Sequence, residues 1–167
     1  MAAAQVDDVY PMVKSCGFKA KASNIVEACR LIMLRHGGRV PDTMEALTAL
    51  PGVGQKTANV VLANAFGVPT IAVDTHVFRV SNRLGLADAP NVEKTEEQLK
   101  KAIPKKDWVA AHHWLIFHGR RVCHSQRPAC AECSLAGMCK AFEAAKKTGG
   151  IVPSPKKKKP AVQAAKA

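Results

Sequence analysis

Apolar residues recur along this chain at every third or fourth position, and no segment alternates apolar and polar residues as a half-buried strand does. Glycine or proline ends most of the apolar segments, and Asp, Asn, Ser or Thr precedes several of them, as at helix N-termini. The pattern predicts an all-α protein. Helices are expected over about residues 6–13, 24–36, 43–48, 55–66, 75–84, 92–103 and 108–118.

The periodicity also predicts which side of a helix faces the core. The second expected helix, capped by Ser23 or Asn24, has one apolar face. That face consists of Ile25, Cys29, Ile32 and Met33. The last expected helix, capped by Asp107 and ended by Gly119, should bury one apolar side. That side consists of Val109, Ala110, Trp114 and Phe117.

A glycine-rich turn reading Leu50-Pro51-Gly52-Val53-Gly54 precedes the expected helix 55–66, whose apolar residues surround most of its circumference, as in a buried helix. Its glycines can adopt positive φ and let a ligand approach the backbone closely. Unpaired amides at the start of the helix, together with its dipole, can bind a phosphate. Such a turn fits a DNA backbone or a nucleotide, and it is weak evidence for either.

Lys56 lies in the first turn of that helix. A cation at this position opposes the helix dipole, which favours the neutral amine. A neutral amine is a nucleophile, so Lys56 is a candidate for covalent catalysis. The alternative is a surface lysine that contacts a phosphate, and the turn alone does not choose between the two.

Residues 68–73 form a short apolar run with a proline, which indicates a buried connector rather than a paired strand. Asp74 follows it at the N-cap position of the next helix, so its simplest role is capping. A carboxylate here is also a candidate acid–base or electrostatic partner for a reactive lysine. In that next helix Arg79 and Arg83 fall outside the apolar face and are expected in solvent.

The chain of 167 residues carries 25 Lys and Arg against 13 Asp and Glu, a formal net charge of +12. Such a charge favours a polyanionic partner, with nucleic acid first and an anionic membrane second. No run approaches the roughly 20 apolar residues of a membrane span, and the N-terminal residues do not resemble a signal peptide. We therefore expect a soluble intracellular protein.

Four of the six cysteines follow the spacing Cys-x6-Cys-x2-Cys-x5-Cys, at Cys123, Cys130, Cys133 and Cys139. Four thiolates this close can hold zinc or an iron–sulfur cluster, and spacing alone chooses poorly between them. A disulfide pair is the remaining alternative, which an intracellular chain disfavours.

Three arginines lie in or beside this cysteine loop: Arg120, Arg121 and Arg127. A loop made rigid by a metal centre would present them to phosphates at little entropic cost, whereas their simplest role is solvation. The nearby His112, His113 and His118 resemble packed or surface histidines of a helix, and no chemistry is assigned to them.

The segments LPGVGQKTANVVLANAFG and VDTHVFRVSNRLGL, together with the cysteine spacing, resemble the endonuclease III family of DNA base-excision glycosylases, over about residues 6–143. The resemblance implies the helix-hairpin-helix DNA glycosylase fold with a C-terminal [4Fe–4S] loop, with zinc as the second choice of metal. By it, Lys56 is the nucleophile, Asp74 the catalytic aspartate, and Gly52, Val53 and Gly54 the phosphate contacts. The implied activity is removal of oxidised pyrimidines from double-stranded DNA and cleavage at abasic sites through a lysine Schiff base. The role of His76 stays open.

The resemblance divides the chain into a partial helical domain (1–106), a helix with the cluster loop (107–144) and a disordered tail rich in Lys, Pro and Ala (145–167). Several helices of the family precede the point where this sequence begins, so the fold is expected to be incomplete and N-terminally truncated. We expect a monomer. Two alternatives to the enzyme remain, a DNA-binding module without catalysis and a redox element.

Overall fold

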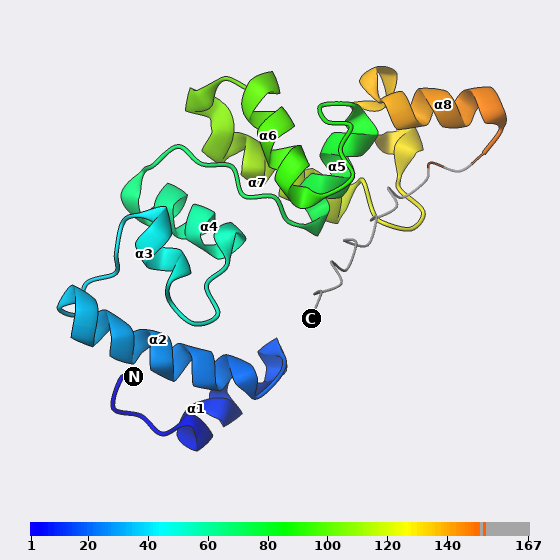
Figure 1. Cartoon of the computed structure of the whole chain (residues 1–167). Coiled ribbons are helices and arrows are strands. Elements are labelled where there is room, and N and C mark those ends of the chain that lie inside the picture. Colours follow the sequence, from blue (N-terminus) through cyan, green and yellow to red (C-terminus); the bar gives the residue numbers. More distant parts are fainter. Residues whose placement is uncertain (151, 153–167) are drawn as a thin grey trace, which may run out of the picture. The chain divides into compact units, whose positions relative to one another are not determined.

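The computed structural model describes residues 1–150 and 152, and over these residues the chain forms α-helices and short 3-10 helices without a strand. The prediction of an all-α protein is confirmed. The chain divides into two compact units, Met1–Thr70 and the residues from Ile71 onward, and each is described by itself. Figure 1 shows both units in sequence colours.

The first unit contains four α-helices and one 3-10 helix: α1 (Val6–Val13), η1 (Lys14–Cys16), α2 (Ala20–His36), α3 (Met44–Thr48) and α4 (Gln55–Phe66). One apolar cluster joins α1 to α2, centred on Val9, Ala22 and Val26. A second cluster joins α3 to α4 around the intervening turn, so these two helices form the predicted helix-hairpin-helix. Its buried members are Leu47, Leu50, Ala58 and Leu62.

Helix α2 begins at Ala20, which corrects the prediction of a cap at Ser23 or Asn24. The residues Ala20 to Ala22 favour helix, and the first bonds run to backbone carbonyls instead of a side-chain cap. Its buried residues are Ala22 and Val26, whereas Met33 of the predicted face is 59% exposed. The buried face is set by α1, which packs against α2 and covers Ala22 and Val26.

Helix α4 spans the predicted residues and ends at Gly67, whose φ of +65° is left-handed. The expectation that it is buried on most sides is wrong for this structure. Only Ala58, Asn59 and Leu62 are buried, because within the first unit α4 packs mainly against α3.

The second unit opens with irregular backbone whose residues Ile71 to Val73 are buried, as predicted for the connector 68–73. The start of that predicted connector is not buried, since Val68 is 39% exposed. Four α-helices follow, α5 (Thr75–Leu84), α6 (Val92–Ala102), α7 (Trp108–Arg121) and α8 (Lys140–Thr148), with short 3-10 helices at Lys105–Asp107, Cys130–Glu132 and Ala136–Met138. The core gathers on α5, α6 and α7. Its buried residues are Ile71, Val73, Val77, Phe78, Val80, Leu99, Ala111 and Leu115.

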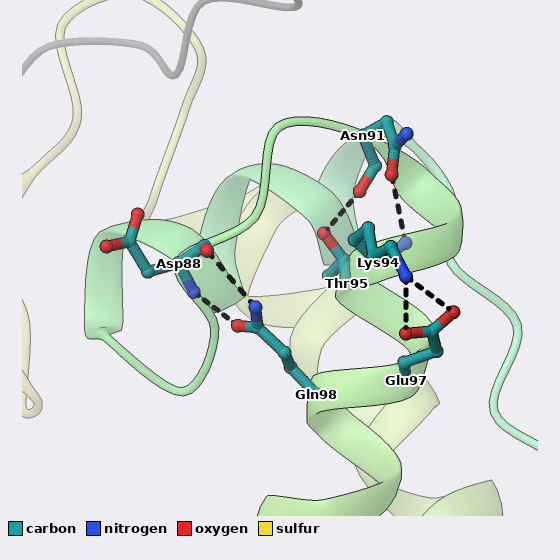
Figure 2. Close-up of polar contacts among 6 residues, drawn as sticks. All are labelled: Asp88, Asn91, Lys94, Thr95, Glu97 and Gln98. Atoms are coloured by element: carbon teal, nitrogen blue, oxygen red, sulfur yellow. Dashed lines mark hydrogen bonds and ion pairs between the residues drawn. The ribbon is translucent and has the colours of Figure 1, made fainter.

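Polar side chains fix the start of α6, as Figure 2 shows. Asn91 Oδ1 accepts from the Lys94 amide at 2.9 Å, and Thr95 Oγ1 donates to the Asn91 carbonyl at 2.8 Å. The side chain of Gln98 exchanges two hydrogen bonds with the backbone of Asp88 and so ties the preceding loop to the helix. Asn91 is therefore an ordinary N-cap.

Helix α7 buries a different face from the predicted one. Trp114 and Phe117 are 64% and 48% exposed, whereas the side that packs against α5 carries smaller or polar residues. Those buried residues are Ala111, His112, Leu115 and Gly119. Asp107 makes no side-chain cap, and the helix continues past Gly119 to Arg121, because this glycine lies against α5 rather than at a helix end.

The last helix, α8, ends at Gly149, so the tail predicted for 145–167 begins with helical residues. Residues 151 and 153–167 of that predicted tail lie outside the described residues. Among the described helices, none combines the length and apolarity that a membrane crossing needs.

Candidate functional site

The turn between α3 and α4 is closed by a hydrogen bond from the Val53 amide to the Leu50 carbonyl at 3.1 Å. Gly52 adopts a φ of +76°, and a Cβ atom there would lie 2.8 Å from the Asn24 side chain. Only glycine fits this position. The Val53 amide is engaged inside the turn, which modifies the prediction that it is open to a phosphate.

Lys56 lies in the first turn of α4 and is exposed. The first hydrogen bond within α4 runs from the Ala58 amide to the Gly54 carbonyl. The backbone amide of Lys56 comes before this bond, so it is one of the N-terminal amides that have no partner within the helix. A Cβ atom at Gly54 would meet nothing within 4 Å, so the helix start is open. Within residues 1–150 and 152, no hydrogen bond or ion pair engages the Lys56 side chain.

Asp74 caps α5, as predicted. Its Oδ1 atom accepts from the amides of His76 and Val77, both at 2.8 Å. All its hydrogen bonds within the described part of the chain go to Oδ1, so Oδ2 accepts none there. One oxygen performs the capping and the other can serve a second partner.

Arg79 and Arg83 are buried, at 7% and 2% exposure, so the prediction that they face solvent is wrong. Arg79 donates from Nε to the Cys123 carbonyl at 3.1 Å and from Nη2 to the Gly119 carbonyl at 2.8 Å. Burial lowers the pKa of Arg79, and the charges of Cys123 and Asp74 partly oppose this shift. These bonds tie α5 to the end of α7 and the start of the cysteine loop.

Arg83 holds the next part of the same loop. Its Nη1 atom donates to Cys123 Sγ at 3.3 Å and to the His124 carbonyl at 2.6 Å, and Nη2 donates to the Ser125 carbonyl at 2.9 Å. The Cys139 thiol in turn donates to the Arg83 carbonyl at 3.3 Å. Both ends of the cysteine loop are thus attached to α5.

One small cavity, of about 20 Å³, is lined by all four cysteines of the loop. Apolar groups such as Leu84, Val122 and Phe142 form much of its remaining wall. The four predicted ligands therefore line one cavity, and their role in holding a metal centre stays a prediction. They are Cys123, Cys130, Cys133 and Cys139.

Burial raises the pKa of the Cys130 thiol, and the charges of the other three thiols raise it further. His118 Nε2 lies 3.7 Å from Cys133 Sγ, and burial lowers the pKa of that imidazole. Over the described residues, no three His, Cys, Asp or Glu side chains converge closely enough to hold a single metal ion. The four thiols instead surround the shared cavity. Their number, chemistry and apolar setting fit a four-thiolate iron–sulfur centre.

The three predicted phosphate-binding arginines are exposed, which is the condition for contact with a polyanion. Arg121 lies over the Phe117 ring, with its Cζ atom 5.1 Å from the ring centroid. Arg127 adopts a φ of +49°, the only positive φ of a non-glycine residue in the described chain. Arg120 lies beside Arg121 in the last turn of α7.

Comparison with known proteins decides the family. The family model described as HhH-GPD superfamily base excision DNA repair protein matches residues 1–105. Endonuclease III of Escherichia coli K12 is 50% identical over 135 residues, covering 80% of this chain, and that of Bacillus subtilis is 46% identical over 149 residues, covering 88%. The chain belongs to the endonuclease III family of this superfamily.

Solved structures agree with the family. A trapped endonuclease III–DNA covalent intermediate has a TM-score of 0.81 and 42% identity, with 87% of this chain and 69% of that chain covered. A thermostable thymine-DNA glycosylase has a TM-score of 0.75 and 25% identity, with 84% and 67% covered. The chain spans 64% of the length of the Escherichia coli endonuclease III and 68% of that of Bacillus subtilis.

Sequence reasoning missed two roles in this site. The burial of Arg79 and Arg83 could not be predicted from the apolar pattern of α5, because their hydrogen-bond acceptors lie about 40 residues further along the chain. His112 was set aside as a packed histidine, and it is packed, but its Nδ1 atom also lies 2.7 Å from the carbonyl of Ala72, close to Asp74.

Proposed function

We propose that this chain is a bifunctional DNA glycosylase and abasic-site lyase that removes oxidised pyrimidines from double-stranded DNA. Its partner is DNA with damaged bases or abasic sites, bound by a monomer inside the cell. The observation that carries this proposal is Lys56, exposed in the first turn of the hairpin helix, in a chain that resembles a trapped endonuclease III–DNA covalent intermediate. A trapped covalent intermediate requires a protein nucleophile.

In the proposed reaction the Lys56 amine attacks the anomeric carbon of the damaged nucleotide, and the bond from that carbon to the base breaks. The bond from the anomeric carbon to the ring oxygen then breaks, the ring oxygen takes up a proton, and the carbon–nitrogen bond becomes a protonated Schiff base. This Schiff base makes the proton on the adjacent sugar carbon acidic, and loss of that proton expels the 3′ phosphate by β-elimination. Asp74 is proposed to stabilise positive charge on the sugar, and within the second unit only its Oδ1 atom is used for capping.

DNA contacts in this proposal come from two parts of the chain. The exposed turn at Gly52 and the uncrowded helix start at Gly54 receive a phosphate, with Val53 shaping the turn. The exposed arginines of the cysteine loop contact further phosphates. These are Arg120, Arg121 and Arg127.

The cysteine loop is proposed to hold a [4Fe–4S] cluster, and such a cluster supplies a covalent tie between four points of the loop. The shared cavity and the thiol contacts of Arg83 and His118 support this assignment. Iron and zinc content of anaerobically purified protein tests it. Cys130→Ser should lose most of the iron and Cys16→Ser, an exposed cysteine outside the loop, should keep it. Stoichiometric zinc without iron would refute the cluster.

Substitutions at Asp74 test whether this residue does more than cap a helix. Asp74→Asn keeps an acceptor for the cap but removes the charge, so the protein should fold normally and lose at least about 100-fold in cleavage of abasic DNA. Asp74→Ala should in addition lose about 1 kcal/mol of folding stability. The matched control is Asn91→Asp, an acid–amide exchange at the N-cap of α6, which should leave cleavage unchanged.

A DNA-binding module without catalysis is the contrasting function. If the wild-type protein binds abasic DNA but neither releases bases nor cleaves the strand, the enzyme proposal falls. If Asp74→Asn cleaves as fast as wild type, Asp74 is a cap and nothing more.

A further inference from the structure

Two histidines make contacts with the chain just before and just after Asp74, one from α7 and one from α5 itself. On the N-terminal side, His112 of α7 is 6% exposed, and its Nδ1 atom lies 2.7 Å from the carbonyl oxygen of Ala72. A carbonyl oxygen only accepts, so Nδ1 carries the proton and donates it. This bond fixes the backbone two residues before Asp74.

On the C-terminal side, the amide of His76 donates to Asp74 Oδ1 at 2.8 Å. The imidazole of His76 is held through Nδ1, which lies 3.1 Å from Arg79 Nη2. A guanidinium only donates, so Nδ1 of His76 is the acceptor. Arg79 is in turn fixed by the carbonyls of Gly119 and Cys123.

Close packing of α5 against α7 supports this arrangement. A Cβ atom at Gly119 would lie 3.0 Å from His76 Cβ and 3.2 Å from Arg79 Nη2. The backbone of α7 therefore lies directly against the residues that follow Asp74, with no room for a side chain between them.

We propose that His112 and the His76–Arg79 pair are positioning residues that fix the Asp74 carboxylate from both sides. The capping bonds occupy Oδ1, so the direction of Oδ2 depends on the backbone from Ala72 to His76. Catalytic groups must be held within about 0.5 Å of their productive positions to act efficiently. This inference rests on the proposed catalytic role of Asp74.

The test measures single-turnover cleavage of duplex DNA with a preformed abasic site, and the dissociation constant for the same DNA. His112→Leu removes the donor to Ala72, whereas the amide of His112→Asn can place a donor near the position of Nδ1. His76→Leu removes the acceptor of Arg79 and leaves the bonds of Arg79 to Gly119 and Cys123 in place. We expect at least about 10-fold slower cleavage for both leucine variants, recovery in His112→Asn, and dissociation constants within about twofold of wild type.

A double-mutant cycle separates positioning of Asp74 from general damage to the fold. If His112 acts through Asp74, adding His112→Leu to Asp74→Asn should slow cleavage by less than about twofold. The same loss in both backgrounds, or leucine variants as fast as wild type while Asp74→Asn is impaired, would overturn the inference and leave the proposed function intact. A wild-type rate no faster than that of Asp74→Asn would overturn both.

Discussion

The guanidinium of Arg83 donates to the Sγ atom of Cys123 at 3.3 Å, although 40 residues separate them in sequence. Arg83 is 2% exposed and also donates to the carbonyls of His124 and Ser125. Helix α5 thus carries the cap residue Asp74 at one end and an anchor of the cysteine loop at the other.

Replacing Arg83 with methionine should destabilise the cysteine loop and the helix together. The variant Arg83→Met removes the buried guanidinium that donates to Cys123 Sγ and to the carbonyls of His124 and Ser125, which should cost about 2–4 kcal/mol of unfolding free energy. Urea unfolding measures this loss, and iron content should fall with it. Arg120→Met, at an exposed position in α7, should change stability by less than about 0.5 kcal/mol. Equal stability of the two variants would contradict the anchoring role.

The two glycines of the hairpin turn should respond differently to alanine. Gly52→Ala forces a Cβ into the Asn24 side chain at a φ of +76° and should destabilise the protein by about 1–3 kcal/mol. Gly54 has a φ of −90°, and a Cβ added there would have no atom within 4 Å, so Gly54→Ala should leave folding nearly unaffected. Thermal or urea unfolding compares them. A larger loss in Gly54→Ala than in Gly52→Ala would show that the turn geometry is different.

The fold of this hairpin could be predicted because its signals are local. Gly52, Gly67 and Thr43 mark a turn, a helix end and a helix start within a few residues of the features they determine, and the structure shows all three. The capping role of Asp74 was predictable for the same reason, since its donors are the amides two and three residues later.

The burial of the α5 arginines and the buried face of α7 could not be predicted, because both depend on contacts between segments far apart in the sequence. The burial of Arg79 and Arg83 arises from acceptors in the cysteine loop, which helix periodicity cannot report. The face of α7 was predicted from its large apolar residues, but α5 packs closely at Gly119 and leaves Trp114 exposed. Small residues at close helix contacts carry little apolar signal, so the pattern favoured the wrong side.

Arg127 offers a way to separate DNA contact from folding. Its φ of +49° is left-handed, a conformation that asparagine tolerates better than arginine. Arg127→Asn should therefore keep or slightly raise the unfolding free energy, while DNA binding weakens. The dependence of binding on salt should also become shallower, with the slope of log K against log salt concentration falling by about one.

Fluorescence anisotropy with labelled duplex DNA at several salt concentrations measures both effects. Glu132→Gln, an exposed change in the same loop that removes a negative charge, is the control and should not weaken binding. An unchanged affinity and salt slope for Arg127→Asn would place this arginine outside the DNA interface.

Covalent trapping tests the central claim most directly. Protein is incubated with duplex DNA that carries one abasic site, borohydride reduces any Schiff base, and mass spectrometry locates the modified lysine. Wild type and Lys14→Ala, a change of an exposed lysine in the same unit, should form the adduct, whereas Lys56→Ala should fold normally and form none. An adduct of equal yield in Lys56→Ala, or no adduct from wild-type protein that binds the same DNA, would contradict the assignment of Lys56 as the nucleophile.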